Sequence, residues 1–187
     1  MLLPLDERPL WVFGYGSLIW KPDFPTAEQQ VARLNDWHRS FFMLSIHHRG
    51  TEAHPGLVLA LDAAEGAYCD GLAFRVAPGH EEPTIAALRE RELISSAYLE
   101  TLQPLRLRDG RAIRALTYVI DPLHVQYCGG LSLDRQAEMI ASAEGKRGPN
   151  CDYLYNTADY LHQLGIADDD LSQLAQQVRA LRANAQR

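Results

Sequence analysis

The sequence has few cysteines and no long apolar run. Its three cysteines, Cys69, Cys128 and Cys151, lie far apart and form no Cys-x-x-Cys pair, which argues against a disulfide framework and a zinc site. Free thiols in a reducing compartment are therefore predicted, and a catalytic cysteine stays an open alternative. No stretch of about 18 apolar residues occurs, so no membrane-spanning helix is predicted.

An excess of basic charge is also missing. The 187 residues contain 18 Lys and Arg against 24 Asp and Glu, a formal net charge of −6. Nucleic acids and anionic membrane surfaces attract basic proteins, so we expect neither as a partner, although a local basic pocket for a small anion is not excluded. The start, "MLLPLDERPLW", has acids and prolines where a secretory signal needs a basic and then an apolar stretch. We therefore expect a cytoplasmic protein.

The order of the predicted elements indicates an α+β protein. Apolar stretches typical of strands fill the chain up to residue 120, with Asp109-Gly110 as a hairpin turn, and helical patterns gather behind them. We predict one domain over residues 1–187, with a core over about 11–165 and a C-terminal packing helix over about 167–184. Its architecture should be a mixed, strongly curved sheet or small barrel with helices packed outside. The strand-like segments are 11–13, 37–44, 57–61, 67–76, 95–104 and 111–120, and the helical ones are 78–94, 132–145, 150–165 and 167–183.

One interrupted strand raises a question of function. The stretch "WVFGYGSLIW" (11–20) begins as a buried strand, breaks at Gly14-Tyr15-Gly16-Ser17, and then resumes its apolar run. Glycines let a ligand approach the backbone, and successive N–H groups form a concave anion site. This loop is therefore a candidate for binding a carboxylate or an oxyanion. The alternative is a bulge or tight turn that binds no ligand.

The same loop lacks three familiar signatures. Gly-Tyr-Gly is followed by Ser-Leu-Ile, which departs from the Gly-x-Gly-x-x-Gly of dinucleotide-binding proteins. Neither a P-loop nor the Gly-x-Ser-x-Gly elbow of a hydrolase is present. From spacing alone, a nucleophilic Ser17 with a histidine base stays open. The candidate bases are His38, His47, His48 and His54.

Four short motifs, in order along the chain, carry a resemblance to one family. They are "VFGYGSLIWKPDF" (12–24), "HRG" (48–50) followed by "PG" (55–56), "RELISSAY" (91–98) and "GPNCDYL" (148–154). On these motifs the chain resembles the ChaC-type gamma-glutamylcyclotransferases, which act on glutathione. The family usually has two glycines before the tyrosine of the third motif, where this chain has Ser96 and Ala97. That departure puts the identity of the substrate in question more than the type of reaction.

The resemblance implies the gamma-glutamylcyclotransferase-like fold and a lyase reaction that needs no metal and no other cofactor. The α-amine of a γ-glutamyl group attacks its own γ-carbonyl carbon, 5-oxoproline closes, and the amine behind the amide bond leaves. From glutathione, this leaving group is Cys-Gly. The attacking nitrogen loses a proton and the leaving nitrogen gains one, which a single carboxylate can achieve as base and then as acid.

The resemblance assigns this catalytic carboxylate to Glu92. Tyr98 follows the same segment, and the hypothesis is that its hydroxyl orients Glu92. Backbone N–H groups of the glycine loop are suited to stabilise the oxyanion, and Arg49 is the first candidate to pair with a substrate carboxylate. No metal ligands are predicted. The predicted substrate-binding residues are Gly14, Tyr15, Gly16, Ser17, Leu18, Ile19, Arg49, Tyr98, Asn150 and Tyr153.

These predictions have structural alternatives. Glu92 ends the alternating run "RERE", which is typical of an exposed helix face, and Arg49 can be a surface arginine. Asn150 can be a helix N-cap and Tyr153 a residue of a helix core. At the level of function, the alternatives to glutathione degradation are turnover of other γ-glutamyl amines or dipeptides, and a non-catalytic module that binds a small anion.

Overall fold

The computed structural model describes residues 9–185. The first eight residues, on which the prediction about a signal peptide rests, lie outside the described residues. The chain divides into two compact units. Unit 1 combines the chain up to Arg39 with Leu61–His124, and unit 2 combines Ser40–Ala60 with the chain from Val125 onward. A single domain over the whole chain stays a prediction.

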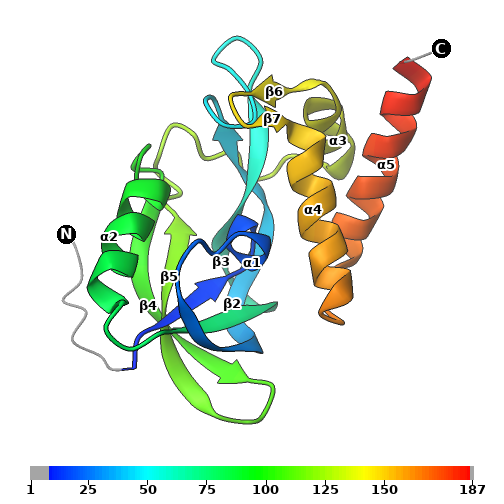
Figure 1. The fold of residues 1–187 in the computed structure, drawn as a ribbon. Coiled ribbons are helices and arrows are strands. Elements are labelled where there is room, and N and C mark those ends of the chain that lie inside the picture. Colours follow the sequence, from blue (N-terminus) through cyan, green and yellow to red (C-terminus); the bar gives the residue numbers. More distant parts are fainter. Residues whose placement is uncertain (1–8, 186–187) are drawn as a thin grey trace. The chain divides into compact units, whose positions relative to one another are not determined.

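Five strands close into a barrel in the order β1-β3-β2-β4-β5 (Figure 1). β1 pairs antiparallel with β3 and parallel with β5, and β4 pairs antiparallel with both β2 and β5. This mixed barrel confirms the predicted α+β class. The strands are β1 (Trp11–Gly14), β2 (Thr26–Ser45), β3 (Gly56–Val76), β4 (Tyr98–Leu107) and β5 (Ala112–Ile120).

Two of the strands are longer than predicted. β2 begins at Thr26, well before the predicted start, and β3 runs without a break through the predicted gap between two strands. Gly66 takes a φ of 78° inside β3, and its N–H donates to Asp36 Oδ1 across 2.9 Å. Because glycine adopts this left-handed conformation at little cost, the chain bends within one strand and does not turn between two.

The hairpin between β4 and β5 has its turn where the sequence predicted it. Gly110 in this turn has a φ of 93°. The strand before it does not end at Pro104 as predicted, because Pro104 pairs with Arg114 inside β4. An antiparallel strand tolerates a proline at a position whose N–H would point away from the partner strand.

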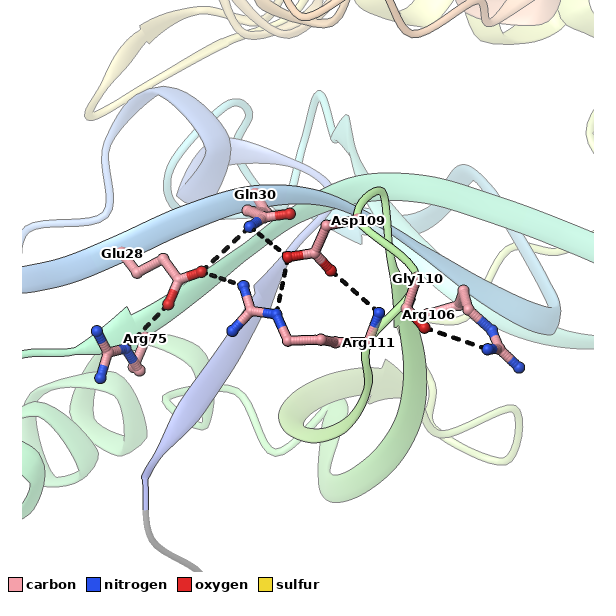
Figure 2. A network of polar contacts seen from close by, with 7 residues as sticks. All are labelled: Glu28, Gln30, Arg75, Arg106, Asp109, Gly110 and Arg111. Atoms are coloured by element: carbon pink, nitrogen blue, oxygen red, sulfur yellow. Dashed lines mark hydrogen bonds and ion pairs between the residues drawn. The ribbon is translucent and has the colours of Figure 1, made fainter.

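Polar contacts tie this hairpin to neighbouring strands on the surface of unit 1 (Figure 2). Arg111 forms ion pairs with Glu28 and Asp109, and Gln30 donates to both of these carboxylates. Arg75 pairs with Glu28 across 3.2 Å. The hydrogen bond from Arg111 holds the pKa of the Glu28 carboxyl below its usual value. Such solvated pairs contribute little to stability, so they mainly fix the position of the hairpin.

The helix α2 (Glu81–Glu92) packs its apolar side against the barrel strands of unit 1, and α1 (Ser17–Trp20) is a single helical turn after β1. Ile85 and Leu88 of α2 enter a buried cluster to which β1 and β5 contribute. Burying each such side chain contributes about 2 kcal/mol, so this packing holds the C-terminal end of α2 in place. The cluster comprises Leu10, Val12, Leu18, Val76, Ile85, Leu88, Leu116 and Tyr118.

Three helices of unit 2 follow the barrel strands in the sequence. α3 (Leu133–Ser142), α4 (Asn150–Gln163) and α5 (Asp169–Ala185) pack against one another, close to the predicted ranges. A two-stranded pair, β6 (Glu144–Gly145) and β7 (Gly148–Pro149), leads into α4. The predicted N-cap role of Asn150 is wrong, since Pro149 is the N-cap and Asn150 is the first helical residue. Over residues 9–185, no helix has the length and apolar character needed to cross a membrane.

Candidate active site

The glycine loop of unit 1 joins β1 to α1. β1 ends at Gly14 as predicted, but the apolar residues that follow form a helical turn and do not resume the strand. A Cβ atom on Gly14 would lie 3.1 Å from Leu18 Cβ and 3.1 Å from Phe74 Cε2. Such contacts are tighter than most Cβ contacts in proteins, so a larger residue at this position would require its neighbours to shift.

The hydrogen bonds of the helical turn determine which backbone N–H groups of the loop are already used within α1. The Ile19 N–H donates to the Gly16 carbonyl oxygen across 3.0 Å, so this predicted donor is used within the turn. The N–H groups of Ser17 and Leu18 open α1, where a helix provides no acceptor for its first donors. These two groups are therefore the better candidates for contacting a developing oxyanion.

Tyr15 anchors the loop to the barrel. Its ring is buried, and its hydroxyl donates to the Tyr118 carbonyl oxygen on β5 across 2.7 Å. Arg39 of β2 donates to the Tyr15 carbonyl oxygen across 3.3 Å. The hydroxyl proton of Tyr15 thus serves the fold, and the contacts hold the loop between two strands.

Glu92 is the last residue of α2. Its side chain is 16% exposed, which differs from the exposed helix face that "RERE" would indicate. Oε1 of Glu92 lies 3.1 Å from Nε of Arg91, whose side chain is 15% exposed. The candidate acid/base is therefore a largely buried carboxylate beside a largely buried guanidinium.

Arg91 joins the end of α2 to the glycine loop. Its Nη2 donates to Ser17 Oγ across 2.9 Å, and its Nη1 donates to the Lys21 carbonyl oxygen across 2.7 Å. Nη1 also lies 3.4 Å from Asp23 Oδ2. The same guanidinium thus contacts the candidate catalytic carboxylate and both ends of α1.

A second polar link runs from α2 into the barrel. Arg89 of α2 binds Glu100 of β4 through two hydrogen bonds of 2.8 and 2.7 Å, and the Glu100 side chain is 2% exposed. The Tyr118 hydroxyl donates to Glu100 Oε2 across 3.2 Å. Burial first of all, and then the charge of Glu100, raises the pKa of the Tyr118 hydroxyl far above its usual value. This hydroxyl therefore keeps its proton, and the link stays intact at neutral pH.

Tyr98 opens β4 just after the segment that departs from the family pattern. It pairs with Ile120 of β5 and packs beside the apolar cluster of unit 1. Ser96 has a φ of 58°, the left-handed region that favours glycine, and Ala97 is fully buried. The predicted contact between Tyr98 and Glu92 stays a prediction.

In unit 2, Arg49 is buried and holds the backbone that leads into α4. Its Nη1 donates to the carbonyl oxygens of Arg147 and Pro149 across 2.8 and 3.1 Å. Its guanidinium carbon lies 5.7 Å from the centre of the Tyr153 ring. Burial lowers the pKa of the Arg49 guanidinium from its usual value. Arg49 is therefore not the surface arginine of the structural alternative.

The glycines of the second motif are required by close backbone crossings in unit 2. A Cβ atom on Gly50 would lie 2.0 Å from Gly56 N, and one on Gly56 would lie 2.2 Å from the Arg49 carbonyl oxygen and 2.7 Å from Asn150 Oδ1. No side chain fits at such distances. The second and fourth motifs therefore meet in one packed cluster of unit 2.

Asn150 and Tyr153 of α4 both bind the backbone of β3. The side chain of Asn150 is fully buried: its Nδ2 donates to the Leu57 carbonyl oxygen, and its Oδ1 accepts from the Leu57 N–H, each across 2.7 Å. The Tyr153 hydroxyl accepts from the Leu59 N–H across 3.3 Å, and its ring stacks edge-on with Phe41. These contacts are structural, and substrate binding by either residue stays a prediction.

Sequence reasoning missed two contributors to this site. Arg91 carries a signal, because it is the first residue of the third motif and precedes Glu92. Glu100 carries a weaker one, as an acid two residues beyond Tyr98 in a strand. Arg91 depends on Ser17, 74 positions earlier, and Glu100 on Arg89 and Tyr118, 11 and 18 positions away, which local patterns do not reveal.

A metal site and one surface groove are candidates for further parts of the site within residues 9–185. Within the described range, no three histidine, cysteine, aspartate or glutamate side chains come together in a way that could hold a metal ion. The three cysteines are free thiols, as predicted. A groove of about 350 Å³ in unit 1 is lined by Arg33, Asp70, Arg106 and their neighbours, and it includes no predicted site residue.

Comparison with known proteins places the chain among similar sequences and folds. A family model described as "ChaC-like protein" matches residues 10–181. The glutathione-specific gamma-glutamylcyclotransferase of Escherichia coli (strain K12) is 38% identical over 178 residues, which cover 95% of this chain and 76% of that protein. Gamma-glutamylcyclotransferase 2-3 of Arabidopsis thaliana is 35% identical over 177 residues, 91% of this chain and 88% of that protein. The crystal structure of a gamma-glutamyl cyclotransferase specific to glutathione from yeast shares the fold, with a TM-score of 0.85, 23% identity, and coverage of 94% and 97% of the two chains.

Proposed function

The chain belongs to the ChaC-like family, and from this premise we propose that it is a gamma-glutamylcyclotransferase that degrades glutathione to 5-oxoproline and Cys-Gly. A bond forms between the α-amine nitrogen and the γ-carbonyl carbon of the γ-glutamyl group, and the amide bond to cysteine breaks. One proton leaves the attacking nitrogen and one reaches the leaving nitrogen. The reaction therefore consumes no water and uses no cofactor, and the proposed setting is the cytoplasm.

The observation that carries the proposal is the guanidinium shared by Glu92 and Ser17. Arg91 lies 3.1 Å from the Glu92 carboxylate and 2.9 Å from the Ser17 hydroxyl. The first and third motifs, far apart in the sequence, therefore supply a carboxylate and a set of backbone donors to one place in unit 1. A base beside an oxyanion site is what an intramolecular aminolysis requires.

In this proposal, Glu92 takes the proton from the attacking amine and returns one to the leaving nitrogen. A positioned acid/base of this kind contributes about 10²–10⁴-fold to the rate. The N–H groups of Ser17 and Leu18 stabilise the oxyanion, and the loss of one such donor costs about 3–4 kcal/mol. Because the reacting groups belong to one molecule, holding the γ-glutamyl chain folded supplies a further part of the acceleration.

A serine hydrolase is supported less well. The contact that Ser17 Oγ makes is with Arg91, and an arginine side chain does not lose its proton in proteins, so it cannot activate a nucleophile. Turnover of other γ-glutamyl compounds is favoured by one observation. Ser96 and Ala97 stand where the family usually has glycines, so this chain has side chains where the family has none. Ser96 also takes a left-handed φ of 58°, the conformation that favours glycine.

The test is the release of 5-oxoproline from glutathione by the wild type and by Glu92→Gln. The variant keeps the shape of the side chain and removes its acid/base function, so we expect activity to fall about 10²-fold or more. Glu90→Gln is the matched control, because Glu90 is exposed on the same helix, and it should keep full activity. Circular dichroism verifies that each variant is folded.

Three outcomes would contradict the proposal. A folded Glu92→Gln variant with unchanged activity would remove Glu92 as the acid/base. A wild type that releases 5-oxoproline faster from γ-glutamyl-alanine than from glutathione would move the substrate assignment to γ-glutamyl dipeptides, and one that turns over neither would favour the anion-binding module.

A further inference from the structure

Arg91 has an unusual set of contacts for a side chain outside the predicted site. Each of its three guanidinium nitrogens meets a different group: Nε the Glu92 carboxylate at 3.1 Å, Nη2 the Ser17 hydroxyl at 2.9 Å, and Nη1 the Lys21 carbonyl oxygen at 2.7 Å. The side chain is 15% exposed, so solvent screens these contacts only weakly.

The three contacts share one rigid group, and two of them are hydrogen bonds while the contact with Glu92 is an ion pair. A guanidinium is rigid and presents its donors in a fixed fork, so the positions of its three partners are coupled. Ser17 and Lys21 are the first residue and the C-cap of α1, and Glu92 ends α2. Arg91 therefore sets the distance and direction from the Glu92 carboxylate to the N–H groups that open α1.

We propose that Arg91 is the positioning residue of this site. It fixes the distance and direction from the Glu92 carboxylate to the oxyanion donors of the glycine loop. The inference rests on the proposed function of Glu92 and of the loop. Arg91 touches neither reacting nitrogen in this role, and acts through the two groups that do. A misplacement of about 1 Å between reacting groups costs about 10²-fold in rate, so loosening this link lowers kcat.

Other charged groups near Arg91 do not replace it. Asp23 lies 3.4 Å from Nη1, and it is an acceptor like Glu92. Arg89, two residues earlier on α2, points away from Arg91 and is committed to the buried Glu100. Neither can donate to Ser17 and contact Glu92 at the same time.

The experiment compares kcat and KM for glutathione in the wild type, Arg91→Met, Arg91→Lys and Arg135→Met. We expect Arg91→Met to lower kcat about 10- to 100-fold with little change in KM. Arg91→Lys keeps the positive charge and should fold normally, but a point charge cannot reach three partners, so its kcat should stay low. Arg135 is an exposed arginine paired with Glu138 on α3, and Arg135→Met should behave like the wild type.

Two further measurements separate positioning from a contribution to folding. Guanidinium ions at low millimolar concentration should restore part of the activity of Arg91→Ala, whereas equal sodium chloride should not. Ser17→Ala should lower kcat less than Arg91→Met does, and the double variant should resemble Arg91→Met, because the Ser17 hydroxyl acts through Arg91.

Three results would overturn the role of Arg91, and one of them would also overturn the proposed function. An active wild type, an inactive Glu92→Gln and an Arg91→Lys with wild-type kcat would overturn this inference alone. The same holds if Arg91→Met loses only thermal stability while its folded fraction keeps full kcat. An inactive wild type would overturn the proposed function and, with it, the role of Arg91.

Discussion

Arg91 Nη2 donates a hydrogen bond to Ser17 Oγ across 2.9 Å, between residues 74 positions apart in the sequence. Arg91 lies in the last turn of the long helix of unit 1, and Ser17 begins the short helical turn after the first strand. The contact joins two motifs that look independent when read along the chain. It also gives Ser17 a structural reason to carry a hydroxyl, one that requires no nucleophilic role.

Asn150→Ala should destabilise the protein. Its amide satisfies both the N–H and the carbonyl of Leu57 in the buried part of unit 2, so truncation leaves two backbone groups without partners. We expect a loss of about 2–4 kcal/mol in the free energy of unfolding. Urea unfolding followed by circular dichroism measures it.

The control for this change is Asn156→Ala on the exposed side of the same helix, which should alter the unfolding free energy by about 0.5 kcal/mol or less. An Asn150→Ala variant that unfolds like the wild type but has a raised KM for glutathione would argue for direct binding of the substrate instead.

Ser96→Gly should stabilise the protein. Ser96 has a φ of 58°, and a residue with a Cβ loses about 1–2 kcal/mol in this region relative to glycine. Part of the gain is offset, because glycine makes the unfolded chain more flexible, and about 0.5–1 kcal/mol should remain. The midpoint of thermal unfolding reports the change.

Ser96→Ala keeps the Cβ and serves as the matched variant, so its midpoint should stay near that of the wild type. Equal midpoints for the glycine and alanine variants would mean that the left-handed conformation costs nothing here. Comparing the glycine variant on glutathione and on γ-glutamyl-alanine also tests whether this position influences the choice of substrate.

Alkaline pH should weaken the fold through Cys128. Burial raises the pKa of this thiol from the ordinary 9.0 to about 11. Between these two values, the folded chain keeps the proton and the unfolded chain releases it, so unfolding becomes easier as pH rises. The contribution is fully present below about pH 9 and is lost as pH rises through about 11.

The measurement is the free energy of unfolding of wild type and Cys128→Ser at several pH values above 8. Tyr118 also has a raised pKa and weakens both proteins in alkali, so the difference between their slopes isolates Cys128. Parallel slopes would show that the thiol has the same pKa in both states.

The sequence by itself determined those features that depend on near neighbours. Glycines at 14 and 16 predicted that the first strand would end in a loop, because these residues do not suit a strand interior. Asp109-Gly110 predicted the hairpin turn, and the helical pattern over 150–165 matches α4, which ends at Gln163 shortly before Gly165 with its φ of 69°. The helix that carries Glu92 was predicted from its own periodicity, and the residue itself from the third motif.

Only the tertiary structure decided what the polar side chains bind. "RERE" indicates an exposed face, yet packing of Ile85 and Leu88 turns the last turn of α2 toward the barrel and buries Glu92 and Arg91. Asn150 fits an N-cap pattern, yet its partner is a strand residue 93 positions earlier. The physical reason is the same in both cases. A buried polar group must find a partner, and the fold, not the neighbouring sequence, determines which partner comes within reach.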